Sequence, residues 1–382
     1  MKIVQLVPAM DQGGVERGVV EMNRVLVKAG HDNLVVSVGG RLEAQIVADG
    51  GRVAHLDVKG KNPLTAWSRA KKLRGLLAAA RPDVVVAHSR VPAWLFVLAN
   101  RSLGLKWITF AHGANSVSAY SKVMTYGDVT VTPSRYIADY LKEHYGIAEE
   151  KLRVIPRAIE REKFDPAKLD GNFVAAKRVE WGLEGFKVVM GLGRITQLKG
   201  YDVLIRALAH LHRTHRAAHA QSRDWKLVIV GEAEALRKDY EAELRALVKS
   251  LGVEEQVVFA GAQSKVAECL SLADVVVSAN WRKPEAFGRS MAEALAMDRP
   301  VVATAFGGAL DIVEDGVNGA LVPPDPQASD VDRAMAFANA IRRVAHAEHG
   351  DLRAPALEKF AFARMAAQAL AVYAEFAEGA RA

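Results

Sequence analysis

Short runs of β-branched and aliphatic residues alternate with amphipathic helical patterns along this chain of 382 residues. In the first part of the chain, the predicted strands are 2–7, 33–38, 53–58, 83–87, 107–111, 129–132 and 152–155. Helical patterns such as 15–29 and 64–80 separate most of them, and Gly30 and Pro82 stop these two helices. Strand–helix alternation favours parallel sheets with helices on both faces, so the sequence predicts an α/β protein.

The same pattern starts again near residue 186, which predicts a second domain. Its predicted strands are 186–191, 225–230, 256–260, 274–278, 300–303 and 319–322. The charged, weakly patterned stretch 159–184 is interpreted as the linker. We therefore predict two doubly wound, Rossmann-like domains, 1–168 and 169–361, that face a central cleft. A last amphipathic stretch, 357–376, predicts a C-terminal helix at about 362–382 that packs back on the first domain.

The net charge of +7 is concentrated in the first part of the chain. Residues 1–170 hold 25 Lys and Arg against 17 Asp and Glu, whereas residues 171–382 hold 26 against 27. A basic first domain indicates either an anionic partner or a solvated basic face. The anionic partners considered are a membrane surface, a phosphorylated glycolipid and nucleic acid. Nucleic acid ranks last, because the basic stretches lack interleaved aromatic residues.

Composition also constrains the compartment. The single cysteine, Cys269, excludes an internal disulfide and fits a reducing compartment. Its apolar neighbours predict a buried structural thiol. No apolar run has the length of a membrane span, and the first residues read as a strand rather than as a signal peptide. We expect a protein that acts in the cytoplasm or at the inner face of the cytoplasmic membrane.

Two glutamates, Glu285 and Glu293, carry the most informative local pattern. Glu285 follows a predicted strand and a short loop, and Glu293 falls in the first turns of the next helix. Both positions belong to the carboxyl edge of a sheet, where open α/β sheets bind ligands. Between them, Gly288 lets the backbone approach a ligand closely. Two acceptors beside free N–H groups suit a polyhydroxylated ligand that carries phosphate.

Two further strand–helix junctions favour anion binding. Gly13 and Gly14 follow the first strand, and a helix N-terminus there can bind an anion, although the dinucleotide spacing is absent. Arg194 and Lys199 flank the first junction of the second domain. Cations at a helix start oppose the helix dipole unless an anion is bound, so we predict a phosphate site there.

Histidines end two strands of the first domain, at His88 and His112, where each can hydrogen-bond or exchange protons. A metal site is not expected. His212, His215 and His219 share a helical spacing, but nearby arginines disfavour a divalent ion. Asp330 and Asp332 are interpreted as residues of a helix start, not as metal ligands.

Taken together, these patterns resemble the retaining glycosyltransferases of the GT-B fold, in particular family 4, over nearly the whole chain. The matching segments are 284–296, 300–304, 307–319, 13–16, 193–200 and 273–278. The resemblance implies a hexosyltransferase that moves a sugar from a nucleotide-sugar donor, with UDP as the expected nucleotide. The implied acceptor is a glycan or glycolipid of the bacterial cell envelope, such as lipopolysaccharide core.

The resemblance assigns donor contacts residue by residue. Arg194 and Lys199 would hold the donor diphosphate and stabilise the departing nucleotide. Glu285 would bind hydroxyls of the donor sugar, and Glu293 both ribose hydroxyls. The backbone at Phe287 and Gly288 would meet the sugar or phosphate.

The remaining assignments concern the base and the acceptor. The base would lie against the loop that ends at Gln263. Gly13 and Gly14 would let the first domain close over the diphosphate. His112 would lie near the sugar and acceptor and is counted with the catalytic residues, whereas Glu16 and His88 are placed on the acceptor side.

The implied chemistry needs no metal and no cofactor. Two fixed cations and helix N-termini can stabilise a leaving diphosphate, and retention is expected from attack on the same face. The sequence departs from the family at Arg157 and Ala158, where Asn-Gly is common, and at 231–236, so no contact is assigned in the latter loop. The alternatives are a GT-B nucleotide-sugar epimerase and a non-catalytic sugar-nucleotide-binding protein.

Overall fold

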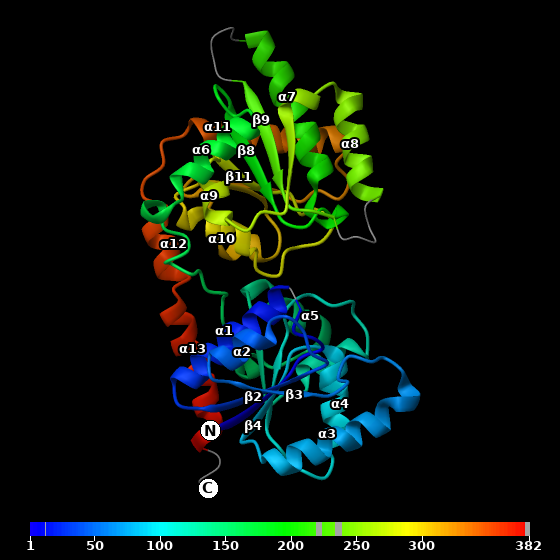
Figure 1. Ribbon diagram of the computed structural model, residues 1–382. Coiled ribbons are helices and arrows are strands. Elements are labelled where there is room, and N and C mark those ends of the chain that lie inside the picture. Colours follow the sequence, from blue (N-terminus) through cyan, green and yellow to red (C-terminus); the bar gives the residue numbers. More distant parts are fainter. Residues whose placement is uncertain (12, 219–223, 234–238, 379–382) are drawn as a thin grey trace. The chain divides into compact units, whose positions relative to one another are not determined.

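The structure is a computed structural model that describes residues 1–11, 13–218, 224–233 and 239–378 (Figure 1). The chain forms two compact units. Unit 1 comprises Met1–Arg157 together with the chain from Ala363 onward, and unit 2 is Ala158–Phe362. The division after Arg157 lies earlier than the predicted one after residue 168, because Ile159 and Phe164 are buried in the core of unit 2.

Unit 1 contains, over the described residues, a seven-stranded parallel sheet of order β3-β2-β1-β4-β5-β6-β7. Its strands are β1 Lys2–Leu6, β2 Asp32–Ser37, β3 Arg52–His55, β4 Val84–Ala87, β5 Trp107–Phe110, β6 Val129–Thr132 and β7 Leu152–Val154. β4 is buried at every residue, as parallel strands covered on both faces are. The predicted strands of the first domain are confirmed to within a few residues at their ends.

Helices cover this sheet. They are α1 Gly14–Lys28, α2 Glu43–Ala48, α3 Ala66–Ala80, α4 Arg90–Asn100, α5 Arg135–Tyr145 and α13 Phe362–Glu378, with the 3₁₀ turns η1 Pro63–Thr65, η2 Ser121–Thr125 and η3 Glu149–Lys151. α5 shows how local sequence sets the bounds: the Ser134 side chain accepts from the N–H of Ile137, and Gly146 ends the helix at φ 65°. α13 lies beside the unit 1 sheet (Figure 1), where Glu375 pairs with Arg153 of β7.

Unit 2 contains a six-stranded parallel sheet of order β10-β9-β8-β11-β12-β13 within the described part of the chain. The strands are β8 Lys187–Leu192, β9 Trp225–Val230, β10 Val257–Gly261, β11 Val275–Ser278, β12 Val301–Thr304 and β13 Gly319–Val322. Alternate residues serve opposite faces: Val188 and Met190 belong to one core cluster, and Val189 belongs to the other.

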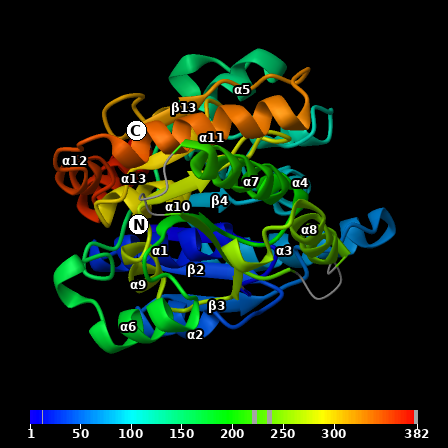
Figure 2. The same cartoon turned by 90° about the horizontal axis from the view of Figure 1, so that it is seen from above.

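The unit 2 helices are α6 Gly171–Glu180, α7 Tyr201–Ala218, α8 Asp239–Leu251, α9 Val266–Ser271, α10 Arg289–Ala296, α11 Asp330–His346 and α12 Arg353–Lys359, with the 3₁₀ turns η4 Pro166–Lys168, η5 Gln197–Lys199, η6 Glu254–Gln256 and η7 Gly308–Asp311. α9, α10 and α12 supply one core cluster, and α7, α8 and α11 the other. Figure 2 shows α7 and α11 side by side over the sheet.

One prediction about a connecting segment is wrong. The predicted linker 159–184 contains α6, and its Trp181 and Leu183 are buried in the unit 2 core, so apolar residues within a charged stretch outweigh its composition. The C-terminal helix predicted at about 362–382 is α13, described as Phe362–Glu378, whereas residues 357–359 of the amphipathic stretch belong to α12. The chain breaks at Phe360 and Ala361, where it makes a parallel bridge to Ile159.

The expectations for Cys269 and for the start of α11 are confirmed. Cys269 is fully buried, and burial raises the pKa of its thiol to about 12, which makes it a structural residue. Ser329 caps α11 by accepting from the N–H of Asp332. Among the described residues, no helix is long and apolar enough to cross a membrane.

Candidate functional site

Both sheets change strand order at one point, and the predicted site residues follow the strands that flank it. In unit 2 the order reverses between β8 and β11, and in unit 1 between β1 and β4. Parallel α/β sheets open a crevice at the carboxyl end of such a switch point, because the connections there leave in opposite directions. Arg194 follows β8, Glu285 follows β11, Gly13 follows β1 and His88 follows β4.

Glycines shape the loop between β8 and α7. Gly193 and Gly200 have φ of 132° and 65°, which L side chains rarely adopt. A Cβ on Gly231 would lie 1.9 Å from the Gly193 carbonyl oxygen, so two loops pack here backbone to backbone. The Tyr201 hydroxyl donates to that carbonyl at 2.8 Å. The loop is thus fixed while it carries Arg194 and Lys199 at the sheet edge.

Lys199 and Glu285 are brought together as an ion pair, Nζ to Oε1. The Asn280 amide also donates to Oε1 of Glu285 at 3.1 Å, and Ser278 donates to Asn280 at 2.9 Å. Each member of the ion pair keeps about a quarter of its side chain exposed, at 25% and 23%. A partly hydrated pair of this kind can exchange partners at little cost.

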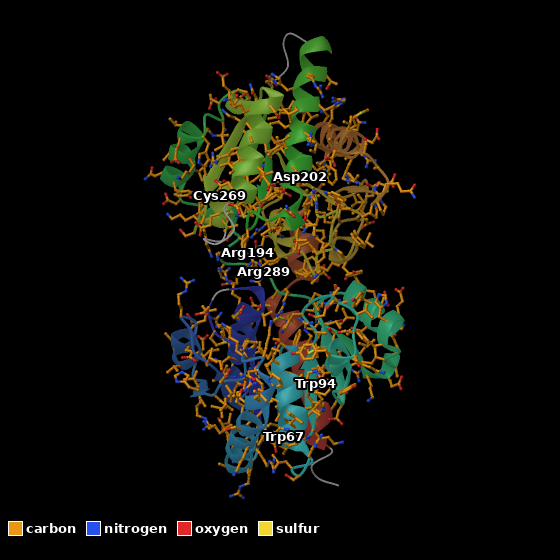
Figure 3. All side chains as sticks on the ribbon, turned by 90° about the vertical axis from the view of Figure 1, so that its right-hand side faces the viewer. Trp67, Trp94, Arg194, Asp202, Cys269 and Arg289 are labelled. Carbon is orange, nitrogen blue, oxygen red and sulfur yellow. The ribbon has the colours of Figure 1, made fainter. Side chains whose placement is uncertain are left out.

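Arg194 is exposed at the end of β8, and Figure 3 marks it with Arg289, the first residue of α10, at the same edge of unit 2. Both side chains have interactions of their own within the protein. A guanidinium offers five N–H groups in a planar fork, which suits phosphate oxygens.

Gly307 and Gly308 hold the Glu285 segment against β12. The N–H of Gly308 donates to the Glu285 carbonyl at 2.8 Å, and Glu285 forms a parallel bridge with Gly307. A Cβ on Gly308 would lie 2.4 Å from the Phe287 carbonyl oxygen. The Phe287 side chain points into the core and packs edge-on against Phe360 at 5.5 Å. A buried side chain leaves only the backbone of Phe287 for the ligand contact that the resemblance assigns to this residue, and that contact stays a prediction.

The remaining donor-side residues lie on neighbouring elements. Gly288 caps α10 at φ 96°, where a Cβ would lie 2.0 Å from the Met291 methyl. Glu293 is partly buried within α10 and has interactions in the protein. The Gln263 amide donates to the carbonyl of Ala260 at 2.6 Å, which orders the loop after β10.

Sequence reasoning missed a second set of polar residues behind this edge. Arg282 donates to both carboxylate oxygens of Asp202, at 3.1 and 2.8 Å, and to the Gln197 carbonyl at 3.0 Å. Burial opposes ionisation of Asp202, but the Arg282 hydrogen bonds and charge outweigh it and lower the pKa. Tyr240 also donates to Asp202 at 3.1 Å. Asn280 and Arg282 follow directly after β11, and that position is the signal that could have identified them.

In unit 1, Gly13, Gly14 and Glu16 form the first turn of α1. Gly13 is its N-cap in extended conformation, and a Cβ there would lie 2.4 Å from an oxygen of Glu16. The Glu16 carboxylate therefore folds back over the helix start, in the place that an anion would take.

His88 and His112 are also brought together. Their rings stack at 5.2 Å between centroids, and Phe110 stacks on His112 at 4.6 Å. Nε2 of His112 lies 3.0 Å from Nδ1 of His88, and Nη2 of Arg157 lies 2.6 Å from Nδ1 of His112. Burial, and next the charge of Arg157, lower the pKa of His88 to about 3 and that of His112 well below its ordinary value. Both imidazoles are neutral at physiological pH.

A metal site at His212, His215 and His219 was considered from their helical spacing and was not expected. In the described part of the chain, no group of three or more His, Cys, Asp or Glu could hold an ion. His212 contacts Asp224, Nδ1 to Oδ1, at 2.8 Å. His219 lies outside the described residues, and so does Leu236 of the divergent loop 231–236.

Two hollows in unit 2 lie apart from the predicted residues. One of about 320 Å³ is lined by residues such as Leu310, Asp351 and Phe360. The other, of about 390 Å³, is lined by residues that include Trp281, Arg282 and Arg333. Neither lining includes a residue that the resemblance assigns to the donor. We place the candidate site at the switch-point edge because ligands bind there in open α/β sheets and because Lys199 and Glu285 pair there.

Comparison with known families agrees with this architecture. Residues 12–163 match the family model Glycosyltransferase Family 4, and residues 174–351 match Glycosyl transferases group 1. The chain is therefore a GT-B protein with one domain of each of these glycosyltransferase families.

The individual relatives have low sequence identity to this chain. A glycosyltransferase from Rickettsia africae ESF-5 superposes with a TM-score of 0.84 at 26% identity, over 98% of each chain. The Anabaena protein Alr3699/HepE, solved in complex with UDP, superposes with a TM-score of 0.80 at 21% identity, over 98% of this chain and 100% of that one. A D-inositol 3-phosphate glycosyltransferase of Acidothermus cellulolyticus is 33% identical over 202 residues, which are 52% of this chain and 43% of the relative. The chain thus spans less than half the length of that relative.

Proposed function

We propose that the protein is a retaining glycosyltransferase that transfers a hexose from a UDP-sugar to an anionic acceptor of the cell envelope. The observation that carries the proposal is the Lys199–Glu285 pair, held by Asn280 beside Arg194 at the switch point of unit 2. A cation and a carboxylate side by side suit a ligand that joins phosphate to hydroxyl groups. The UDP complex of the Anabaena relative supports the choice of nucleotide.

The chemistry assigns a role to each group. Arg194 and Lys199 would stabilise the negative charge that grows on the departing diphosphate, so transfer would need no metal ion. Glu285 would accept hydrogen bonds from the sugar hydroxyls, and Glu293 from the ribose. The bond to the acceptor oxygen would form on the face from which the diphosphate leaves, and the proton of the acceptor would pass to the leaving phosphate.

Binding of the diphosphate would compete with an internal contact. Lys199 already neutralises Glu285, so a phosphate must draw the ammonium from that carboxylate. The exchange frees Glu285 to bind the sugar. The same pair would therefore couple nucleotide binding to sugar binding.

The acceptor is proposed to be anionic because the excess positive charge lies in residues 1–170. A phosphorylated core of lipopolysaccharide would satisfy this charge. A small phosphorylated polyol is the second candidate, because the relative of Acidothermus cellulolyticus is named for inositol 3-phosphate. Assays with phosphorylated glycolipid and with inositol phosphate, at the same ionic strength, distinguish the two acceptors.

Peripheral contact with an anionic membrane is proposed for the start of α3. Leu64 is 89% exposed and Trp67, marked in Figure 3, is 57% exposed. Lys61, Lys71 and Lys72 are exposed around them. Apolar and aromatic side chains with flanking lysines suit a bilayer interface. Sedimentation with anionic vesicles should fall for Leu64→Ser/Trp67→Ser, and equal sedimentation of this variant would remove the contact.

Calorimetric titration of the purified chain with UDP tests the proposal, with GDP and NAD as parallel titrants and chelator present. We expect binding of UDP that is at least tenfold tighter than that of GDP or NAD, on the order of 1.4 kcal/mol. Preference for GDP would change the donor, and binding of NAD alone would overturn the proposal.

The epimerase and binding-protein alternatives are tested by one further reaction. A UDP-sugar incubated without acceptor should give no epimer, and with acceptor it should give glycoside and UDP. Accumulation of the epimer would favour an epimerase. Binding without turnover for every acceptor tried would favour a sugar-nucleotide-binding protein.

A further inference from the structure

A continuous chain of six side chains runs through the interior of unit 1, from Arg157 at the carboxyl end of β7 to Asn23 of α1. Its successive contacts are Arg157 Nη2 to His112 Nδ1, 2.6 Å; His112 Nε2 to His88 Nδ1, 3.0 Å; His88 Nε2 to Gln5 Oε1, 2.8 Å; Gln5 Nε2 to Asn33 Oδ1, 3.1 Å; Asn33 Nδ2 to Asn23 Oδ1, 2.7 Å; and Asn23 Nδ2 to the Ile46 carbonyl, 3.1 Å. Gln5, Asn33 and Asn23 are at most 1% exposed, and His88 is 3% exposed.

The first donor fixes the direction of every later hydrogen bond. A guanidinium has no acceptor, so Nδ1 of His112 must carry a lone pair and its proton must lie on Nε2. That N–H donates to Nδ1 of His88, which places the His88 proton on Nε2 as well. The second imidazole then donates to the Gln5 carbonyl oxygen, and the amide groups continue in the same direction to the backbone of Ile46. Both histidines thus have a single tautomer.

Two glycines accommodate the ends of this chain. A Cβ on Gly18 of α1 would lie 2.0 Å from Nη1 of Arg157, and a Cβ on Gly51 would lie 2.0 Å from Oδ1 of Asn23. The guanidinium also lies 5.4 Å from the centre of the Phe110 ring, which stacks on His112. The position of Arg157 is therefore set by contacts on two sides besides the histidine.

The charges around the histidines all disfavour protonation. Arg157, from the end of β7, acts on both rings, and His88, from the end of β4, acts on His112. α1 contributes Gly18 to this region, and β1 contributes the neutral Gln5. A second proton on either ring would require an N–H to face another N–H, either at Arg157 or between the two histidines.

We propose that Arg157 is a positioning residue that holds His112 as a neutral imidazole with its proton on Nε2, and that His112 acts in the reaction without gaining or losing a proton. Both ring nitrogens of His112 form hydrogen bonds within the protein. The residue therefore presents a fixed, uncharged ring to the substrate, with the Arg157 guanidinium as a permanent cation beside it. The tautomer assignment stands on unit 1 alone, whereas its effect on turnover rests on the proposed function.

Nitrogen NMR of the complete chain, labelled at the histidine side chains, tests the tautomer. In the native protein we expect His88 and His112 to give signals of unprotonated Nδ1 and protonated Nε2 at pH 7. The pattern should persist at pH 5, where exposed histidines are protonated. Assignment uses His88→Gln and His112→Gln. Titration of either ring above pH 5, or a proton on Nδ1, would overturn the proposal whatever the enzyme assay shows.

Three variants then connect the tautomer to turnover. Arg157→Met removes the donor, so the titration midpoint of His112 should rise by at least about one pH unit. The pH profile of kcat should then show a decrease at low pH that the native enzyme lacks, while KM for UDP-sugar stays unchanged. Arg157→Lys restores a group that can only donate and should restore the native pH profile. Arg153→Met removes another arginine of β7, which pairs with Glu375 instead, and should change neither readout.

The outcomes separate the possible explanations. If Arg157→Met leaves the histidine signals as in the native protein, Arg157 does not position His112 and the proposal fails. If the signals shift but the pH profile of kcat does not, the link to turnover fails while the tautomer assignment stands. Failure of the native protein to bind UDP would instead count against the proposed function alone.

Discussion

The two switch points of this protein are built from opposite kinds of polar chemistry. The edge of unit 2 carries full charges in partly exposed pairs, Lys199 with Glu285 and Arg282 with Asp202. The edge of unit 1 carries a buried chain of neutral groups that one guanidinium orients. Exposed pairs can exchange partners and so can bind a charged ligand. In the buried neutral chain, exchange of one hydrogen bond would leave a buried polar group without a partner. The chain therefore holds His112 and His88 in one tautomer.

The largest expected effect is a loss of folding stability of unit 1 at acid pH, which tests the buried neutral chain. The pKa of His88 is about 3 in the folded chain, that of His112 is also lowered, and both return to about 6.5 on unfolding. The unfolded chain then binds more protons below pH 6.5. Stability is complete above that pH and falls by about 1.4 kcal/mol per pH unit for each histidine as the pH drops towards the folded values.

Urea unfolding at pH 7, 6 and 5 measures this loss, with hydrogen exchange to show which unit opens. We expect β1 and β4 of unit 1 to lose protection before β8 and β11 of unit 2. Arg157→Met should flatten the slope, because it raises the folded pKa values. A free energy of unfolding of unit 1 that is constant from pH 7 to 5 would refute the buried neutral pair.

Replacement of Glu285 tests the exposed charge pair of unit 2. Glu285→Ala should lower kcat by at least roughly tenfold, about 1.4 kcal/mol, because the sugar loses its acceptor. UDP should bind as well or better, because Lys199 no longer has a competing carboxylate. Glu241→Ala, which removes a surface glutamate paired with Arg245, is the matched control. Normal transfer by Glu285→Ala would show that the donor sugar lies elsewhere.

Replacement of Lys199 sharpens the assignment of the cation. Lys199→Ala should weaken UDP binding by about tenfold, since one charged contact to the diphosphate is lost. Lys265→Ala, which breaks the pair with Asp170 on the surface of the same unit, should leave the affinity unchanged. Equal calorimetric affinity of both variants would remove Lys199 from the diphosphate site.

The smallest expected effect concerns Asn280, which supports Glu285 without carrying charge. Asn280→Ala should lower kcat by roughly two- to fivefold, about 0.5–1 kcal/mol, because Glu285 keeps one of its two partners. The affinity for UDP should not change. A loss as large as that of Glu285→Ala would give Asn280 a direct contact with the substrate.

The sequence predicted the sheet architecture well because each strand is a short apolar run bounded by turn residues. Strands β6, β9 and β13 were predicted with their observed bounds, 129–132, 225–230 and 319–322. The segment 159–184 was misjudged because its few buried residues, such as Phe164 and Trp181, have no period along the chain. Their burial depends on contacts from α9, α10 and α12, far away in sequence.

Contacts between residues far apart in the sequence also limited the prediction of the site. The placement of Arg194, Lys199 and Glu285 near a sheet edge could be predicted, because each lies in the loop that follows a strand. The contact of Arg157 with His112 could not, because it joins the ends of β7 and β5 through a gap that exists only where Gly18 has no side chain. The sequence marked Arg157 as unusual but gave no indication of which group it would touch.

The return of α13 to unit 1 has a consequence for the order of events during synthesis. Unit 2 is one contiguous stretch, Ala158–Phe362, whereas unit 1 begins at Met1 and takes up the chain again from Ala363. A ribosome therefore delivers all of unit 2 before the last helix of unit 1 has emerged. We expect the N-terminal unit to be the first to start folding and the last to finish, and a nascent chain stalled before α13 should expose the surface that this helix covers.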